Sequence, residues 1–283
     1  MQLDGRRTSS NVDDRRKGGK TTASLGIGGI VVAVIITWMM GGNPLDVLTG
    51  QLADVTQVGT EYAPSAEEEA MATFASQILA GTEDVWTKEF EKLGRTYVPP
   101  KMVLFTRATN SGCGSASSQT GPFYCSADQT VYIDLSFFDQ MQKQLGAGGD
   151  FAYAYVIAHE VGHHVQYLLG TLGEVQQQQR RMSQRESNQL NVRLELQADF
   201  YAGIWAYHDH KMYNSLEAGD IEEGLNAASA IGDDRLQMQS QGYTVPDAFN
   251  HGTSTQRVRW LRKGASTGRV ADGDTFSLNY SSL

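Results

Sequence analysis

The stretch Ala158-His159-Glu160-Val161-Gly162-His163-His164 lies inside an apolar run that predicts one helix from about Asp150 to Leu169. Residues four apart on a helix lie one turn above each other, so His159 and His163 share one face. A helical His-Glu-x-x-His motif is typical of a zinc site in which both histidines bind the metal and Glu160 takes a proton from a water molecule. Apolar residues flank the motif on both sides, which favours a buried site over an accidental motif on a solvated helix. We expect this helix to organise the fold.

A catalytic zinc site needs a third protein ligand, and the sequence offers one downstream. The common extension is a histidine six residues beyond His163, but Leu169 stands there. The segment 188–205 has helical spacing and places Glu195 and Asp199 four residues apart. We expect Glu195 to be the third ligand and Asp199 to accept the free ring N–H of a ligand histidine. The alternative for this pair is a solvated acidic face, and the weaker ligand candidates elsewhere are Glu174, Glu186, His208 and His210.

These residues carry a family resemblance. The pattern His159-Glu160-x-x-His163 followed by Glu195-Leu-Gln-Ala-Asp199 resembles the glutamate-type zincins, of which thermolysin is the best-known member. Nearly the whole chain resembles the bacterial membrane-anchored neutral zinc metallopeptidase family, which implies a zincin-like fold and peptidase chemistry but no substrate. The place of His251 after the ligand glutamate resembles that of the histidine that stabilises the transition state in thermolysin-like enzymes. A structural role is the alternative for His251.

The predicted fold class is α+β and mainly helical, with a small β-sheet preceding the active-site helix and one N-terminal transmembrane helix. A capping box at Ser65-Ala-Glu-Glu68 predicts where the first helix of the domain begins. The resemblance further implies that the strand Val131–Leu135, or its neighbour, forms the edge of the substrate cleft, an ordinary core hairpin being the alternative. The expected organisation is a disordered arm (1–22), a transmembrane anchor (23–41), a juxtamembrane linker (42–64), the zincin-like domain (65–264) and a loose tail (265–283).

The anchor prediction rests on an uncharged, mostly apolar run from Ala23 to Met40, which is just long enough to span a bilayer as a helix. A cleaved signal peptide and a buried core helix are the alternatives. Residues 1–22 carry six basic and three acidic side chains, a net charge of +3, against −9 for the whole chain of 283 residues. By the positive-inside rule the N-terminus is expected inside and the domain outside the bacterial inner membrane.

Cys113 and Cys125 are the only cysteines. In a domain predicted to be exported, an even pair indicates a disulfide, with zinc ligation by the two thiolates as the weaker alternative. The acidic remainder of the chain has no basic stripe, which argues against nucleic-acid binding.

The sequence therefore predicts an anchored metallopeptidase with one Zn²⁺, whose partner is a protein or peptide substrate. Two other functions stay open: a non-catalytic, zinc-stabilised binding or assembly module, and a zinc hydrolase of non-peptide amides. The intact Glu160 argues against the binding module, since a structural site needs no base.

Overall fold

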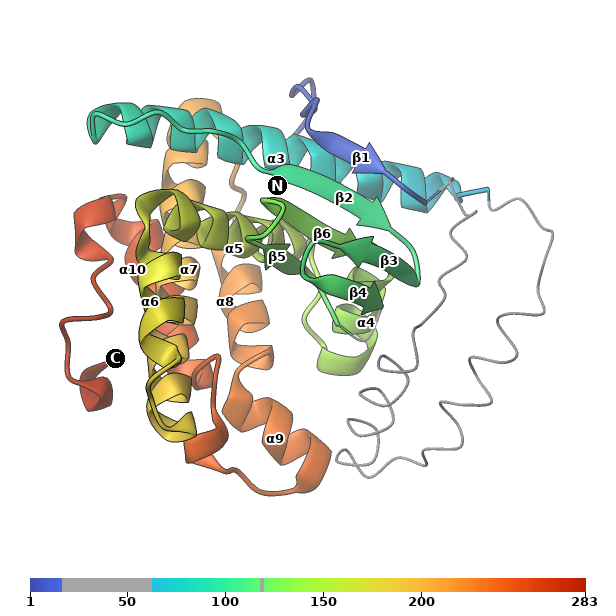
Figure 1. Cartoon of the computed structure of the whole chain (residues 1–283). Coiled ribbons are helices and arrows are strands. Elements are labelled where there is room, and N and C mark those ends of the chain that lie inside the picture. The colour runs from blue at the N-terminus through green and yellow to red at the C-terminus, as the bar shows by residue number, and fades with distance from the viewer. Residues whose placement is uncertain (17–62, 118–119) are drawn as a thin grey trace.

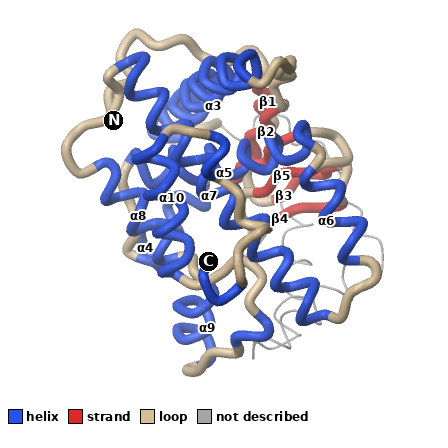
Figure 2. The backbone as a smooth tube through the Cα atoms, turned by 90° about the vertical axis from the view of Figure 1, so that its left-hand side faces the viewer, coloured by secondary structure: helices blue, strands red, loops and turns tan. Residues whose placement is uncertain are grey.

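A computed structural model of the chain describes residues 1–16, 63–117 and 120–283 (Figure 1). The strands gather on one side of the molecule and helices make up the rest, as the rotated view shows (Figure 2). The α+β, mainly helical class is therefore confirmed. The predicted anchor and most of the predicted linker fall outside the described residues. Among the residues that are described, no helix is long and apolar enough to cross a membrane.

Four strands form one sheet in the order β1-β2-β6-β5. Strands β1 (Val12–Asp14), β2 (Lys101–Phe105) and β6 (Thr130–Asp134) are parallel, and β5 (Phe123–Cys125) pairs with β6 in the antiparallel sense. Because β6 is paired on both sides, the first-named candidate for the cleft edge, Val131–Leu135, is wrong. The neighbouring strand β5 lies at the edge of the described sheet.

Alternation along the strands divides their side chains between two apolar clusters. Met102 and Leu104 of β2 face the main core, whereas Val103 and Phe105 belong to a second cluster on the opposite face. The second cluster includes Ala116 of a hairpin made of β3 (Ala108–Ser111) and β4 (Gly114–Ser117). This hairpin covers the face of the sheet that the helices leave open.

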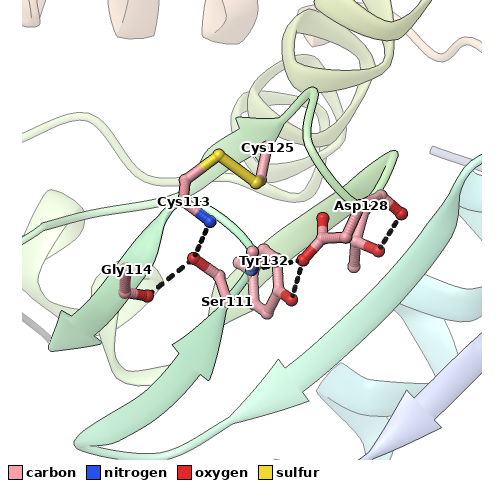
Figure 3. Close-up of a disulfide and its surroundings, with 8 residues drawn as sticks. Ser111, Cys113, Gly114, Cys125, Asp128 and Tyr132 are labelled. Atoms are coloured by element: carbon pink, nitrogen blue, oxygen red, sulfur yellow. Dashed lines mark hydrogen bonds between the residues drawn. A yellow bond between two sulfur atoms is a disulfide. The ribbon is translucent and has the colours of Figure 1, made fainter.

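A disulfide ties this hairpin to the edge strand (Figure 3). Cys113, in the hairpin turn, bonds to the fully buried Cys125 of β5, so the predicted disulfide is confirmed. The carboxylate of Asp128 accepts hydrogen bonds from the Gly112 N–H at 2.6 Å and from the Tyr132 hydroxyl at 2.8 Å. The disulfide thus ties the hairpin turn to β5, and Asp128 ties the same turn to the loop that follows β5.

The main core is built around helix α5 (Asp150–Leu169), which is buried nearly all round, as its apolar sequence predicts. Among the described helices, four pack directly against it: α3 (Ala66–Lys92), α6 (Thr171–Gln179), α7 (Gln184–Tyr213) and α8 (Asp220–Ala230). The described residues also form α4 (Ser136–Leu145), α9 (Asp233–Gln241) and α10 (Ser254–Thr267). The predicted capping box is present at the start of α3, where Ser65 and Glu68 exchange hydrogen bonds.

Glycines set the closest helix crossings. A Cβ atom on Gly162 would lie 3.0 Å from the carbonyl oxygen of Ala198, so α5 and α7 meet at the motif itself. A Cβ atom on Gly203 of α7 would lie 2.3 Å from the carbonyl oxygen of Leu261 in α10. Larger side chains would push these helices apart.

Residues 1–16 are part of the domain, so the prediction of a disordered arm is wrong for them. Their strand β1 pairs with β2, and the Arg6 guanidinium makes two hydrogen bonds, at 2.6 and 2.8 Å, to the buried carboxylate of Asp209. Buried Arg16 donates to Asp14 and to the backbone of α3. Charges that look solvated in the sequence are paired here with carboxylates of distant helices.

The predicted loose tail is also wrong. Helix α10 continues to Thr267, and two short 3₁₀ helices follow at Val270–Asp272 and Tyr280–Ser282. Gln197 of α7 donates to the Gly273 carbonyl at 2.9 Å, and the terminal Leu283 is buried. Side chains of α7 and α10 donate hydrogen bonds to backbone carbonyls of the tail, and hydrophobic periodicity does not reveal such contacts.

Candidate metal centre

Three side chains converge where α5 crosses α7. One ligand atom each from His159, His163 and Glu195 lie within 4.8 Å of one another. The Nε2 atom of His159 lies 3.2 Å from Oε2 of Glu195, and the Nε2 atom of His163 lies 3.5 Å from the same oxygen. All three side chains are at most 13% exposed. The structure thus brings together the three residues that the sequence nominated.

These distances match the geometry of bound zinc. Ligand atoms about 2.0–2.1 Å from a tetrahedral zinc lie roughly 3.3 Å from each other, which is close to the two separations observed. Two imidazoles and one carboxylate also form a donor set that zinc uses in catalytic sites, with the fourth position left for water. The residues present therefore fit the metal.

His159 is held by a buried ion pair. Its Nδ1 atom donates to Oδ1 of Asp199 at 2.8 Å, as predicted. The Arg257 guanidinium of α10 donates to both oxygens of Asp199 at 2.9 Å, and the Tyr155 hydroxyl donates to Oδ1 at 2.6 Å. Asp199 is fully buried and Arg257 is 3% exposed. With Nδ1 carrying the proton, the lone pair of Nε2 points to the metal position.

His163 is held by neutral amides instead. Its Nδ1 atom lies 2.9 Å from Oε1 of Gln166 on the same helix. The Nε2 amide of Gln166 donates to the carbonyl oxygen of Leu194 at 2.7 Å and to Oε1 of Gln197 at 3.1 Å. Gln166 is fully buried.

Burial and charge act on the same ionisable groups in opposite directions. Burial disfavours the charged form of His159, but Asp199 and Glu195 raise the pKa of His159 to about 10 in the metal-free protein. Burial also opposes ionisation of Asp199, yet Arg257 and His159 bring the pKa of Asp199 down to about 2. The imidazoles of His163 and His159 outweigh burial and hold the pKa of Glu195 well below its usual value. Both carboxylates are therefore ionised beside a protonated His159, and a metal ion would have to displace that proton.

The remaining nominated residues lie around this centre. Glu160 is next to His159 on α5 and is 8% exposed. His251 lies in the loop before α10 and interacts electrostatically with Glu195. The backbone N–H of His251 donates to Oδ2 of Asp233 at 2.7 Å, and its Nδ1 atom lies 3.3 Å from Oδ1 of Asp233. Its Nε2 atom takes part in no hydrogen bond among the described residues, and the ring is half exposed.

The other histidines and the weaker ligand candidates lie outside this centre. Buried His164 lies 2.7 Å from the Val98 carbonyl oxygen and 2.9 Å from the Tyr124 hydroxyl, and burial lowers its pKa to about 4. Glu186 caps α7 together with Ser183, His208 faces the Gly268 carbonyl, and His210 faces the Leu216 N–H. Among the described residues, the metal-capable cluster on α5 and α7 includes none of them, nor Glu174.

Sequence reasoning did not identify two groups that hold the site in place, Arg257 and Gln166, and it gave Asp233 an orienting role only as the less favoured alternative to a solvated face. The one signal available was physical, since a carboxylate placed among apolar residues requires a cation. Arg257 supplies that cation 58 residues after Asp199.

Comparison with known proteins gives a family and curated relatives. The family model described as "Putative neutral zinc metallopeptidase" matches residues 1–276. The uncharacterized protein YpfJ of Escherichia coli K12 is 50% identical over 286 aligned positions, which cover 98% of this chain and 99% of the relative. The uncharacterized protein Rv2575 of Mycobacterium tuberculosis H37Rv is 45% identical over 191 positions, 64% of each chain. No solved structure matches significantly.

Proposed function

Since this chain belongs to the neutral zinc metallopeptidase family, we propose that it hydrolyses peptide bonds at a single zinc ion bound by His159, His163 and Glu195. The observation that carries the proposal is the spacing of the three ligand atoms, which suits a tetrahedral zinc. Zinc in such a site supplies Lewis acidity, which polarises a carbonyl and lowers the pKa of a bound water.

The chain's own residues supply the proton transfers. Glu160, next to His159 on α5 and in electrostatic contact with His163, takes the proton of the attacking water and passes it to the leaving amine. His251 donates from Nε2 to the developing oxyanion, and Asp233 orients it through the backbone N–H and Nδ1. Half exposure suits a group that must meet substrate.

A zincin-like cleft belongs to the same proposal. The edge strand β5 contacts helix α5, because the Tyr124 hydroxyl of β5 hydrogen-bonds Nδ1 of His164. An extended substrate pairing with β5 would therefore lie beside the active-site helix.

Anchoring by residues 23–41 in the bacterial inner membrane, with the domain outside, stays a prediction. It conflicts with the docking of residues 1–16, since a single crossing would separate them from the sheet that β1 joins. Reporter fusions at both ends of the chain test this orientation: reporters on opposite sides support a single crossing, and reporters on one side exclude it.

The test of function uses the full-length protein, because residues 1–16 belong to the fold. Zinc content and cleavage of a peptide library are measured for wild type, Glu160→Gln and Glu195→Ala, with exposed Glu174→Gln as control. We expect one zinc in wild type and in the control, its loss in Glu195→Ala, and retention in Glu160→Gln with cleavage reduced by at least about 10²-fold.

Other results would change the assignment. Zinc retained in Glu195→Ala would exclude Glu195 as a required ligand, and full cleavage by Glu160→Gln would exclude Glu160 as the base. A zinc-loaded wild type that cleaves only non-peptide amides would be an amide hydrolase, and one that cleaves nothing would support a binding module.

A further inference from the structure

The two histidines of the metal centre have different hydrogen-bond partners: a carboxylate, Asp199, for His159 and an amide, Gln166, for His163. Gln166 is not part of the His-Glu-x-x-His motif. Gln166 follows His163 by three residues, so it lies on the same face of α5. It is fully buried, and both ends of its carboxamide are used. A buried amide with both ends paired is costly to disturb, because any unmatched atom loses its hydrogen bonds to water without replacement.

The orientation of this amide is fixed by the Leu194 carbonyl. A carbonyl oxygen only accepts hydrogen bonds, so the atom 2.7 Å away from it must be the NH₂ group of Gln166. The same NH₂ group donates its second hydrogen to Gln197, whose own NH₂ group donates to the Gly273 carbonyl at 2.9 Å. The carbonyl end of Gln166 must therefore face His163.

This orientation dictates the tautomer of His163. The Gln166 oxygen can only accept, so Nδ1 of His163 must carry a hydrogen. The lone pair of the neutral ring is then on Nε2, the nitrogen that faces Glu195. A metal cannot bind at Nδ1 without breaking the hydrogen bond to Gln166.

The same amide also sets the distance between two ligands. Leu194 immediately precedes Glu195, so Gln166 links the turn of α5 that carries His163 to the turn of α7 that carries Glu195. A carboxylate at position 166 could accept from His163, but it would face the Leu194 carbonyl and the Gln197 oxygen without a donor. Only a carboxamide satisfies all three neighbours.

We propose that Gln166 is a positioning residue of the zinc centre, which fixes the Nδ1–H tautomer of His163 and holds His163 at metal-binding distance from Glu195. The inference rests on the proposed function only in that the centre binds zinc.

The test compares two buried glutamines in the full-length protein. Gln166→Met keeps the shape of the side chain but removes both roles, and Gln197→Met is the matched control one link farther from the metal. Zinc affinity is measured by competition with a chromophoric chelator at fixed pH, and the Co²⁺ absorption spectrum reports the ligand geometry. We expect Gln166→Met to weaken zinc binding about 10–100-fold and to change the Co²⁺ spectrum, as loss of a ligand-orienting residue does. Gln197→Met removes one acceptor of Gln166 but no contact to His163, so it should weaken zinc binding by less than Gln166→Met does.

Equal effects of the two substitutions, or a Gln166→Met affinity within about 3-fold of wild type, would overturn the proposal. A second measurement needs no variant: ¹⁵N NMR of the zinc-loaded wild type should show His163 bound through Nε2 with a slowly exchanging Nδ1–H. Metal attached to Nδ1 would refute the inference even if Gln166→Met fails to fold. A wild type that binds no zinc would instead refute the proposed function, so the two failures are distinguishable.

Discussion

Removing the guanidinium of Arg257 should cost far more stability than removing an exposed arginine. In the structure Arg257 makes two 2.9 Å hydrogen bonds to Asp199, and the two side chains are 3% and 0% exposed. The Arg257→Met substitution removes the guanidinium from the buried Asp199 carboxylate and leaves it only the charge of His159, which Asp199 must share with Glu195. Breaking a buried pair in this way costs about 3–5 kcal/mol, which is a large fraction of the roughly 5–15 kcal/mol that stabilises a typical protein.

The assay is urea denaturation of the metal-free protein, followed by circular dichroism at neutral pH. Arg269→Met is the control, because Arg269 pairs with Asp272 at 2.8 Å but is 74% exposed. Such a surface pair contributes at most about 1 kcal/mol. The double variant Asp199→Asn/Arg257→Met removes both charges and should be more stable than Arg257→Met alone by at least about 1 kcal/mol. If Arg257→Met costs no more than Arg269→Met, the argument for a buried ion pair is refuted.

Three further predictions concern pH, packing and the disulfide. The pKa of His159 is raised to about 10 without metal, so zinc must displace a proton from His159. Zinc affinity should therefore rise about tenfold per pH unit around neutrality. Titration calorimetry in buffers of different ionisation enthalpy measures this proton release, and finding none would contradict the prediction. Gly203→Ala should lower the free energy of unfolding by about 1–3 kcal/mol, because the new Cβ atom would lie 2.3 Å from a backbone oxygen of α10. The control Gly173→Ala should be neutral or stabilising, because its Cβ atom would meet nothing within 4 Å. Equal effects of the two substitutions in denaturation experiments would argue against the close α7–α10 crossing. Replacing Cys113 and Cys125 by serine should cost about 2–4 kcal/mol by releasing the hairpin from β5; an unchanged denaturation midpoint would show that noncovalent contacts suffice.

Local features of the chain were predictable because they depend on neighbours in sequence. The apolar run around His159 specifies a buried helix, and four-residue spacing aligns His159 with His163 on it. The capping box at Ser65 marks a helix start because the pattern satisfies backbone N–H groups within one turn. Glu195 was a reasonable candidate because it lies in an apolar helical context where an unpaired carboxylate would be costly.

Contacts between distant segments were not predictable in this way. The N-terminal segment has the composition of a disordered arm, yet its charges are paired with carboxylates such as Asp209, which lies more than two hundred residues later. The edge position of β5 follows from which strands pair, and two adjacent short strands carry no signal of that order.

The sequence by itself therefore determined the helix class, the disulfide pair and the residue types that can bind zinc, because periodicity and ligand chemistry are properties of short segments. Only the tertiary structure decided which groups orient those ligands. Arg257 neutralises Asp199 and Gln166 fixes His163 because α7 and α10 pack closely through glycine, and α5 meets α7 at Gly162. Burial at those crossings makes each polar contact obligatory, and burial is a property of the assembled fold.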